Sequence, residues 1–368
     1  MKIGFDAKRL FLNYTGLGNY SRNIVKNLQK YYPEHEYHLY TTKALRNPDT
    51  EYFFDKAKFI IHENKSAFNF YWRSVSIIKD LEKDKIDVFH GLSAELPIGI
   101  KRSNIKSVVT IHDLIFKHFK QDYNPVDRMI YDFKSGYACR NAAKVIAISE
   151  FTKKDILKAY NISEDKIEVV YLPLDNKFSK KASQNELEKV KYEFNLPDKF
   201  FLYVGSVIGR KNLKSVVKAM SIIEPKWRIP LVVVGSGKKY LEEVKAMITN
   251  DGLGDDILFL KNISNEDLPK IYQLAEFFVF PSLYEGFGLP VLEAIQSGKS
   301  VIVSQDTSLE EVAGNCGIVL PQNDVISLAK SIKEKSTLSN VLGDCDKHLK
   351  KFDPEVIAKK IMEVYKGK

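Results

Sequence analysis

Short apolar runs recur along the chain and are separated by stretches with the periodicity of amphipathic helices. Runs that are apolar on both faces, such as residues 200–204 and 231–234, are typical of parallel strands covered by helices on both sides. The pattern predicts strands in both halves of the chain. These predicted strands are 2–6, 37–41, 58–62, 87–91, 107–112, 144–149, 167–171, 200–205, 230–235, 257–261, 277–281, 300–304 and 317–320.

The alternation of strands and helices is interrupted between residues 172 and 180. This stretch contains Pro173, is polar and has no periodicity, so we predict a linker there. Each side of the linker repeats the pattern of βαβ units. The sequence therefore predicts an α/β protein with two doubly wound, parallel-sheet domains. The carboxyl ends of both sheets are expected to face a central cleft, where such sheets bind ligands.

The composition is that of a globular protein, since 44% of the 368 residues are hydrophobic and 28% are charged. These fractions argue against a disordered or low-complexity chain. The three cysteines, Cys139, Cys316 and Cys345, are widely spaced and odd in number. We therefore expect neither a disulfide framework nor a cysteine-based zinc site, and we expect a reducing, cytoplasmic compartment. We also expect no signal peptide and no membrane span.

Positive charge is concentrated in the first half of the chain. The formal net charge is +9, and residues 1–172 contain 28 basic and 21 acidic residues. A basic half can meet nucleic acid, an anionic membrane surface or an acidic substrate, and it can equally be a solvated lysine-rich surface. Charge alone leaves these alternatives open.

The most informative motif lies in residues 280–298. A predicted strand is followed by a glycine-bearing loop, and a helix begins near Pro290. Free backbone N–H groups at the start of a helix form a site for an anion. Glu285 in the loop and Glu293 in the opening turns of the helix can both reach one ligand there. Carboxylates accept hydrogen bonds from vicinal hydroxyls, so this pair suits a ribose or a hexose.

A basic pair, Arg210 and Lys211, follows the first predicted strand of the second half. Their guanidinium and ammonium groups suit a diphosphate, and a solvated basic pair is the alternative. Gly205 and Ser206 are small and leave room for a ligand at the end of the same strand. Asn212 is predicted to be the N-cap of the helix that follows.

Residues 15–21, Thr-Gly-Leu-Gly-Asn-Tyr-Ser, follow the first predicted strand and open a helix. They contain part of a dinucleotide-binding fingerprint, but Ser21 stands where its third glycine would be. The second predicted strand also lacks the acidic residue that holds an NAD ribose. We interpret Gly16, Leu17 and Gly18 as a flexible lip that approaches a substrate or phosphate, and a plain tight turn is the alternative.

Two histidines lie at the carboxyl ends of predicted strands, the edge from which active-site groups project in such sheets. His112 ends the strand 107–112, and His90 is placed similarly in the strand 87–91. A structural role in the core is the alternative for both. We find no metal-ligating motif, since the DxD-like run 344–346 is expected to be a loop, and we predict no metal site.

Taken together, these segments resemble the retaining GT-B glycosyltransferases of family 4, nucleotide-sugar-dependent enzymes with two Rossmann-like domains. The most specific part of the resemblance is the pair Glu285 and Glu293. The resemblance implies an N-terminal acceptor domain, residues 1–172 plus 354–368, because the C-terminal helix of such enzymes returns to it. It implies a C-terminal donor domain, residues 181–353. The other segments that carry the resemblance are 15–21, His112, 149–152, 209–212 and 307–314.

The resemblance also implies roles for the candidate residues. Glu285 and the amides after it hold the donor sugar and phosphate, and Glu293 holds the ribose. The implied catalytic residues are His112, Glu285, Arg210 and Lys211. The implied donor-binding residues are Gly205, Ser206, Ile263, Gly286, Phe287, Gly288, Leu289 and Glu293. The implied acceptor and phosphate loop is Gly16, Leu17 and Gly18.

The activity implied by the resemblance is metal-independent transfer of a hexose, of the mannose type, from a GDP- or UDP-linked donor to a glycan or lipid-linked acceptor. Residues 4–9 and 15–20 resemble bacterial surface-polysaccharide mannosyltransferases. We expect no cofactor besides the donor, and the basic first half suits a peripheral contact with the anionic inner face of the plasma membrane. An epimerase or hydrolase on the same fold is the nearest alternative. A nucleic-acid-binding protein is the other, but it does not explain the carboxylate pair.

Overall fold

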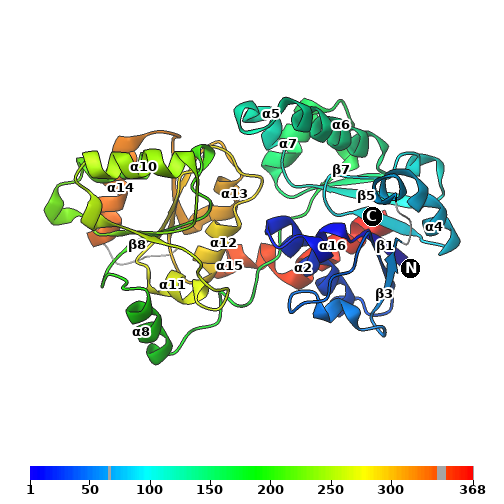
Figure 1. Ribbon diagram of the computed structural model, residues 1–368, viewed down its shortest axis with the longest axis horizontal. Helices are drawn as coiled ribbons and strands as arrows, with labels where there is room; N and C mark the ends of the chain where they lie inside the picture. Colours follow the sequence, from blue (N-terminus) through cyan, green and yellow to red (C-terminus); the bar gives the residue numbers. More distant parts are fainter. Residues whose placement is uncertain (65–67, 338–344, 368) are drawn as a thin grey trace. The chain divides into compact units, whose positions relative to one another are not determined.

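The computed structural model describes residues 1–64, 68–337 and 345–367. The chain forms two compact units, residues 1–173 with 351–368 and residues 174–350. Each unit contains one parallel sheet with helices on both faces (Figure 1). Both units therefore have the doubly wound architecture predicted from the strand and helix pattern.

The sheet of the first unit has the strand order β3-β2-β1-β4-β5-β6-β7, and neighbouring strands pair in parallel. The order reverses beside β1, which is where doubly wound sheets bind ligands at the carboxyl ends of their strands. The strands are β1 (Lys2–Asp6), β2 (Glu36–Thr41), β3 (Phe59–Glu63), β4 (Val88–Gly91), β5 (Lys106–Ile111), β6 (Lys144–Ala147) and β7 (Ile167–Val169).

The sheet of the second unit has the order β10-β9-β8-β11-β12-β13, again with parallel pairing. Its central strands are buried along their whole length, as expected for a sheet covered on both faces. All the predicted strands of both units are confirmed, each within two residues of its predicted ends. Those of the second unit are β8 (Phe201–Val204), β9 (Leu231–Val234), β10 (Ile257–Leu260), β11 (Phe278–Phe280), β12 (Val301–Ser304) and β13 (Gly317–Leu320).

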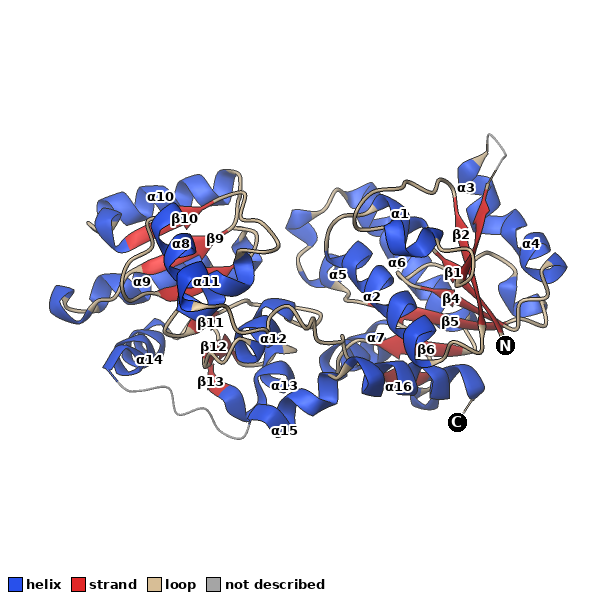
Figure 2. Cartoon of the chain, turned by 90° about the horizontal axis from the view of Figure 1, so that it is seen from below, coloured by secondary structure: helices blue, strands red, loops and turns tan. Residues whose placement is uncertain are grey.

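Helices connect the strands and cover the sheets (Figure 2). None of the helices in the described ranges has the length and apolar character needed to cross a membrane. The first unit contains α1 (Lys8–Leu12), α2 (Gly16–Tyr31), α3 (Asn69–Tyr71), α4 (Ile77–Lys83), α5 (Ile115–His118), α6 (Pro125–Asn141), α7 (Glu150–Ala159) and α16 (Pro354–Lys366). The second contains α8 (Gln184–Glu193), α9 (Leu213–Ile222), α10 (Lys239–Asn250), α11 (Leu268–Leu274), α12 (Leu289–Gln296), α13 (Leu309–Ala313), α14 (Val325–Thr337) and α15 (Cys345–Leu349).

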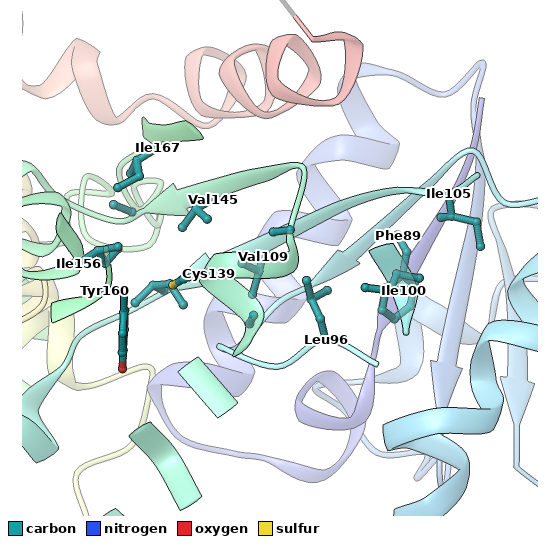
Figure 3. Close-up of a cluster of buried hydrophobic side chains, with 14 of the residues drawn as sticks. Phe89, Leu96, Ile100, Ile105, Val109, Cys139, Val145, Ile156, Tyr160 and Ile167 are labelled. Carbon is teal, nitrogen blue, oxygen red and sulfur yellow. The ribbon is translucent and has the colours of Figure 1, made fainter. Parts of the chain in front are cut away.

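A continuous apolar core lies between the first sheet and helices α4, α6 and α7 (Figure 3). Phe89 of β4, Val109 of β5 and Val145 of β6 project into it from three neighbouring strands. Cys139 of α6 and Ile156 of α7 are fully buried against them. Burial of apolar area on this scale holds the strands in register, so that their carboxyl ends form one edge.

The C-terminal helix α16 packs against α2 and belongs to the first unit (Figure 1). Its Tyr365 is buried, and the hydroxyl lies 2.6 Å from Nδ1 of His90 in β4. Phe352, just before the helix, is also buried and its ring lies 5.2 Å from that of Tyr171. Phe352 and α16 thus complete the core of the unit that β1 begins.

The expectation that the cysteines form no disulfide is wrong for one pair. Cys316 and Cys345, the first residue of α15, are joined by a disulfide, and their Cα atoms are 5.6 Å apart. Neither the odd cysteine count nor a separation of 29 residues marked this pair in the sequence. Cys139 is free and buried in the core described above.

Candidate functional site

The loop between β11 and α12 carries Glu285, and the turn after β8 carries Arg210 and Lys211. An Nη1 atom of Arg210 donates to Oε1 of Glu285 at 2.9 Å and to the carbonyl of Tyr284 at 3.0 Å. The Lys211 ammonium lies 3.5 Å from the same carboxylate oxygen. The three charged side chains are only 12–15% exposed, so this ion-pair cluster is well shielded from water.

Ser308, the residue before α13, holds the conformation of this loop. The hydroxyl of Ser308, fully buried, lies 2.8 Å from the carbonyl of Glu285 and 2.9 Å from that of Phe287. Gly288 precedes α12 with φ of +110°, and a Cβ there would collide with the side chain of Leu309. Pro290 follows in the first turn, as predicted. The backbone amides at the start of α12 are therefore fixed at the carboxyl edge of the second sheet.

The ammonium of Lys211 occupies space that a side chain at position 205 would fill. Gly205 has φ of +148°, and a Cβ built there would lie 3.0 Å from the Lys211 nitrogen. Burial lowers the pKa of Lys211, and the charges of Glu285 and Glu293 act in the opposite direction. Gly205 was predicted to leave room for a ligand. It leaves room for the Lys211 ammonium, which is the cation that the ligand would contact.

The second carboxylate of the motif, Glu293 of α12, is partly buried. The hydroxyl of Tyr272 in α11 donates to its Oε2 at 3.1 Å. Burial raises the pKa of Glu293 to about 7, although Tyr272, Lys177 and Lys211 favour the charged form. Tyr272 was missed at the sequence level, because it lies on another helix and 21 residues before its partner.

Because the raised pKa of Glu293 is a property of the folded chain, it predicts a pH dependence of stability. The folded carboxyl keeps its proton between its ordinary pKa of 4.5 and about 7, whereas the unfolded one loses it. The free energy of unfolding therefore falls as pH rises through this window. We expect Glu293→Gln to exceed the wild type in urea unfolding at pH 8 by about 2 kcal/mol, allowing for partial exposure, and to match it at pH 4.5. An equal difference at both pH values would contradict the assignment.

Asn212 occupies the predicted N-cap position of α9, but its side chain does not cap the helix. Its backbone is left-handed, with φ of 57°, because it ends the 3₁₀ turn Gly209–Lys211 instead of entering the helix from an extended segment. Its side chain makes no cap hydrogen bond, and Nδ2 instead donates to Oδ1 of Asn323 at 3.2 Å. This contact joins the turn that carries the basic pair to the segment before α14.

Two predicted donor-binding residues lie on other loops of the second unit. Ser206 follows β8 and is exposed, beside the basic pair. Ile263 is partly exposed after β10, next to Asn262, whose backbone is left-handed. Both β8 and β10 end at the carboxyl edge where Glu285 lies, because all strands of this sheet run in parallel. Their contacts with a donor stay predictions.

In the first unit, His112 directly follows β5. Its Nε2 lies 2.9 Å from the carbonyl of Leu92, which can only accept, so Nε2 carries the proton and Nδ1 is the acceptor. The ring contacts that of Tyr20 edge to face at 4.5 Å. Burial lowers the pKa of His112 to about 4, so the imidazole is neutral at pH 7. The residue is thus a fixed, uncharged hydrogen-bonding group at the carboxyl edge of the sheet.

Gly16, Leu17 and Gly18 form the first turn of α2, after a short helix, α1, that the sequence did not suggest. Oδ1 of Asn13 accepts from the amides of Thr15 and Gly18 and holds this turn. A Cβ at position 18 would collide with the Asn13 carbonyl, whereas Gly16 has open space around it. The interpretation of Gly16 as part of an open lip therefore stays a prediction. The glycine at position 18 is explained by its close packing against the Asn13 carbonyl.

His90, the other strand-end histidine, belongs to the core. It is completely buried, and its Nε2 lies 2.8 Å from the Thr110 hydroxyl while Nδ1 meets Tyr365. Both ring nitrogens are therefore already hydrogen-bonded within the first unit. The structural alternative considered for His90 is the one that its contacts support.

The described residues bring together one group that could hold a metal ion, which no sequence motif indicated. The ligand atoms of His38, His62 and Asp84 all lie within 4.8 Å of one another. Nδ1 of His38 lies 2.9 Å from Nε2 of His62, and Nδ1 of His62 lies 3.3 Å from Asp84. The three residues come from β2, β3 and the end of α4. Of the DxD-like run, Asp344 lies outside the described residues, and Cys345 and Asp346 begin α15 instead of forming the predicted loop.

Comparison with known proteins finds a glycosyltransferase match in each half of the chain. A sequence profile described as "Glycosyl transferases group 1" matches residues 184–365, and one described as "Glycosyltransferase Family 4" matches residues 14–178. The two matches together span the second unit and most of the first. They also cover the ion-pair cluster around Glu285 and the strand-end His112.

Individual relatives agree with these matches. The O-antigen chain mannosyltransferase B of Escherichia coli is 29% identical over 357 residues, 90% of each chain. The serotype-specific mannosyltransferase WbdA of Escherichia coli is 30% identical over 261 residues, which are 68% of this chain but only about a third (32%) of that protein. The crystal structure of Anabaena HepE in complex with UDP shares the fold over the whole of both chains, with a TM-score of 0.74 and 17% identity. This chain therefore belongs to the GT-B glycosyltransferases of family 4.

Proposed function

We propose that this glycosyltransferase is a retaining enzyme that transfers a mannose-type hexose from a nucleoside diphosphate to a glycan or lipid-linked acceptor in surface-polysaccharide synthesis. The observation that carries the proposal is the shielded cluster of Arg210, Lys211 and Glu285 with Glu293 nearby on α12. The two Escherichia coli relatives named above are mannosyltransferases, which supports a mannosyl donor. HepE was crystallised with UDP, so the tests below include UDP and UDP-linked donors as well.

The donor's diphosphate is proposed to lie against Arg210, Lys211 and the amides at the start of α12. The guanidinium already presents Nη1 to two oxygen acceptors, and a diphosphate offers the same kind of acceptor with more charge. Glu285 keeps both cations oriented toward this position and accepts hydrogen bonds from the sugar hydroxyls. Glu293, held by Tyr272, accepts from the ribose hydroxyls, which favour its charged form.

In the proposed reaction, the bond between the sugar's anomeric carbon and the diphosphate oxygen breaks, and a bond to the acceptor oxygen forms on the same face. The acceptor's hydroxyl proton goes to the departing phosphate oxygen. Negative charge develops on that phosphate, where preorganised donors stabilise it most. Arg210, Lys211 and the α12 amides supply this stabilisation, so we propose that added divalent cations are not required. The neutral His112 accepts a hydrogen bond from a sugar hydroxyl through Nδ1.

Nucleotide binding is the first test, because it depends only on the second unit. We expect GDP or UDP at a hundred times its dissociation constant to raise the free energy of unfolding by about 2.7 kcal/mol. The corresponding nucleoside monophosphate lacks the group that meets the basic pair and is expected to bind more weakly. Thermal-shift and urea-unfolding measurements with a panel of nucleotides check this. A protein that responds to none of the diphosphates would contradict the proposed donor site.

Transfer itself is tested with GDP-mannose and with UDP-hexoses, each with and without a glycan acceptor and with a chelator present. We expect a glycosylated product whose anomeric configuration, read by NMR, equals that of the donor. An inverted product would refute the retaining mechanism. Conversion of the donor at the same rate without an acceptor would instead indicate an epimerase or a hydrolase.

A further inference from the structure

The first unit contains a large apolar pocket at the carboxyl edge of its sheet, with a cavity volume of about 660 Å³. This volume lies within the range of roughly 300–1,000 Å³ that is usual for small-molecule sites. Side chains from the 70–77 segment, from the loop after β4 and from α6 line it. The lining residues used below are Phe70, Tyr71, Leu96, Met129, Ile130 and Phe133.

The pocket exposes large apolar side chains that a soluble protein normally covers. Phe70, Met129 and Phe133 are 75%, 66% and 60% exposed, and Tyr71 and Ile130 are exposed beside them. Single exposed apolar residues need no explanation, but a contiguous group around a hollow marks a binding site. Water in contact with this group is released when an apolar ligand enters, which favours binding.

Three large apolar residues of helix α6 face the pocket and not the core. Its buried positions in the second half are small, namely Ser135, Gly136, Ala138 and Cys139. The large apolar residues that line the pocket, Met129, Ile130 and Phe133, recur at spacings of one, three and four residues and stay exposed. A helix that packs only for stability would bury the large residues, so this distribution points to a ligand.

One end of the pocket is polar. The Arg73 guanidinium donates from Nε to both carboxylate oxygens of Asp6, at 3.1 and 3.0 Å, and it also contacts Glu95. Lys134 of α6 lies 3.2 Å from Glu95. Asp6 ends β1, so these charged residues lie at the carboxyl edge of the sheet. The pocket therefore suits an amphiphile with an apolar chain and a polar end.

The pocket is joined to the candidate catalytic histidine by a short loop. Leu92 holds His112 through its carbonyl, and Glu95 and Leu96, a few residues later, line the pocket. A ligand whose chain fills the pocket would have its polar end on the sheet edge that carries His112. This placement is the one required of an acceptor and not of the nucleotide, whose proposed groups lie in the second unit.

We propose that this pocket binds the hydrocarbon chain of a lipid-linked acceptor, a proposal that rests on the proposed transferase function and specifies its acceptor class. A hollow of about 660 Å³ lined by three segments can contact a hydrocarbon chain from several sides, which a flat apolar patch resting on a bilayer does not. The polar cluster of Asp6, Arg73, Glu95 and Lys134 meets the sugar or phosphate end of that acceptor. The acceptor is thus recognised by its hydrocarbon chain in the pocket and by its hydroxyl at the carboxyl edge of the sheet.

Binding is tested first, with the whole protein, by calorimetry. We expect saturable, one-to-one binding of farnesyl phosphate and of dodecyl phosphate below their aggregation concentrations, and none of inorganic phosphate. The two amphiphiles distinguish an isoprenoid from an acyl-type chain. Ile130→Glu and Phe133→Ser should weaken binding at least tenfold. Ile326→Glu, at an apolar residue of α14 that is 71% exposed, is the matched control and should not.

Activity provides the second readout, with one glycan presented free and linked to a lipid. We expect Ile130→Glu to raise KM for the lipid-linked form at least tenfold and to leave KM for the free glycan unchanged. Absence of saturable amphiphile binding, or equal loss in Ile130→Glu and Ile326→Glu, would overturn the pocket assignment. Partition into neutral vesicles without saturable binding would indicate a membrane contact instead. Amphiphile binding without any transfer would overturn the proposed function and leave the pocket standing.

Discussion

Replacing Glu285 by glutamine is expected to lower kcat/KM by at least about thirtyfold, which corresponds to about 2 kcal/mol of transition-state stabilisation. The carboxylate orients both cations of the cluster, at 2.9 Å from Arg210 and 3.5 Å from Lys211. Glutamine keeps the shape but removes the charge, so both cations lose the group that fixes them and the donor loses an acceptor for its hydroxyls. Steady-state kinetics with the donor identified by the nucleotide panel measure the effect.

The fold should survive this substitution, because Ser308 holds the loop through backbone carbonyls and not through the Glu285 side chain. Circular dichroism and urea unfolding check this directly. Glu242→Gln is the matched control, since that carboxylate is 72% exposed on α10 and should leave kinetics unchanged. A Glu285→Gln enzyme with wild-type kcat/KM would show that the ion-pair cluster has no part in the reaction.

Replacing Arg210 by lysine is expected to cost about 10² to 10³ in kcat/KM, the usual effect of removing one preorganised donor to developing negative charge. Lysine keeps the positive charge but loses the planar fork that reaches Glu285 and the Tyr284 carbonyl together. The loss should appear in kcat more than in KM, because the leaving diphosphate gains charge only in the transition state.

Stability measurements separate this effect from unfolding. The Arg210→Lys variant should keep its unliganded unfolding midpoint and lose part of the stabilisation by nucleoside diphosphate. Arg228→Lys is the control for the substitution type, because Arg228 bonds the Ile223 carbonyl and Asp256 away from the cluster. Equal kinetics in the Arg210 and Arg228 variants would argue against a diphosphate at this position.

The strands were predictable because a buried parallel strand is apolar on both faces, a local property that a short window reveals. The two candidate pairs were also predictable from a short window, because the members of each pair are close in sequence. Glu285 and Glu293 lie in one loop and the helix after it, and Arg210 and Lys211 are adjacent. Tyr272 could not be found this way, because its contact with Glu293 depends on how α11 packs on α12. The disulfide between Cys316 and Cys345 could not be predicted either, because it too depends on tertiary contacts.

Helix α6 shows a second limit of pattern analysis. Apolar residues at helical spacing normally indicate the buried face, and by that rule Met129, Ile130 and Phe133 belong to a core. The sheet instead receives the small residues Ser135, Gly136 and Ala138, and the large ones remain accessible. Periodicity gives the spacing of a stripe but not the partner it meets, so the pocket became visible only with the fold.

The chain passes between the two units twice, near residue 173 and again near residue 350. Tyr365, which contacts His90 in the middle of the first sheet, is therefore synthesised only after the whole of the second unit. The second unit is contiguous and can fold during synthesis, whereas the first cannot complete its core until α16 has been made. We therefore expect the first unit, although it begins earlier in the chain, to be the later of the two to complete its fold.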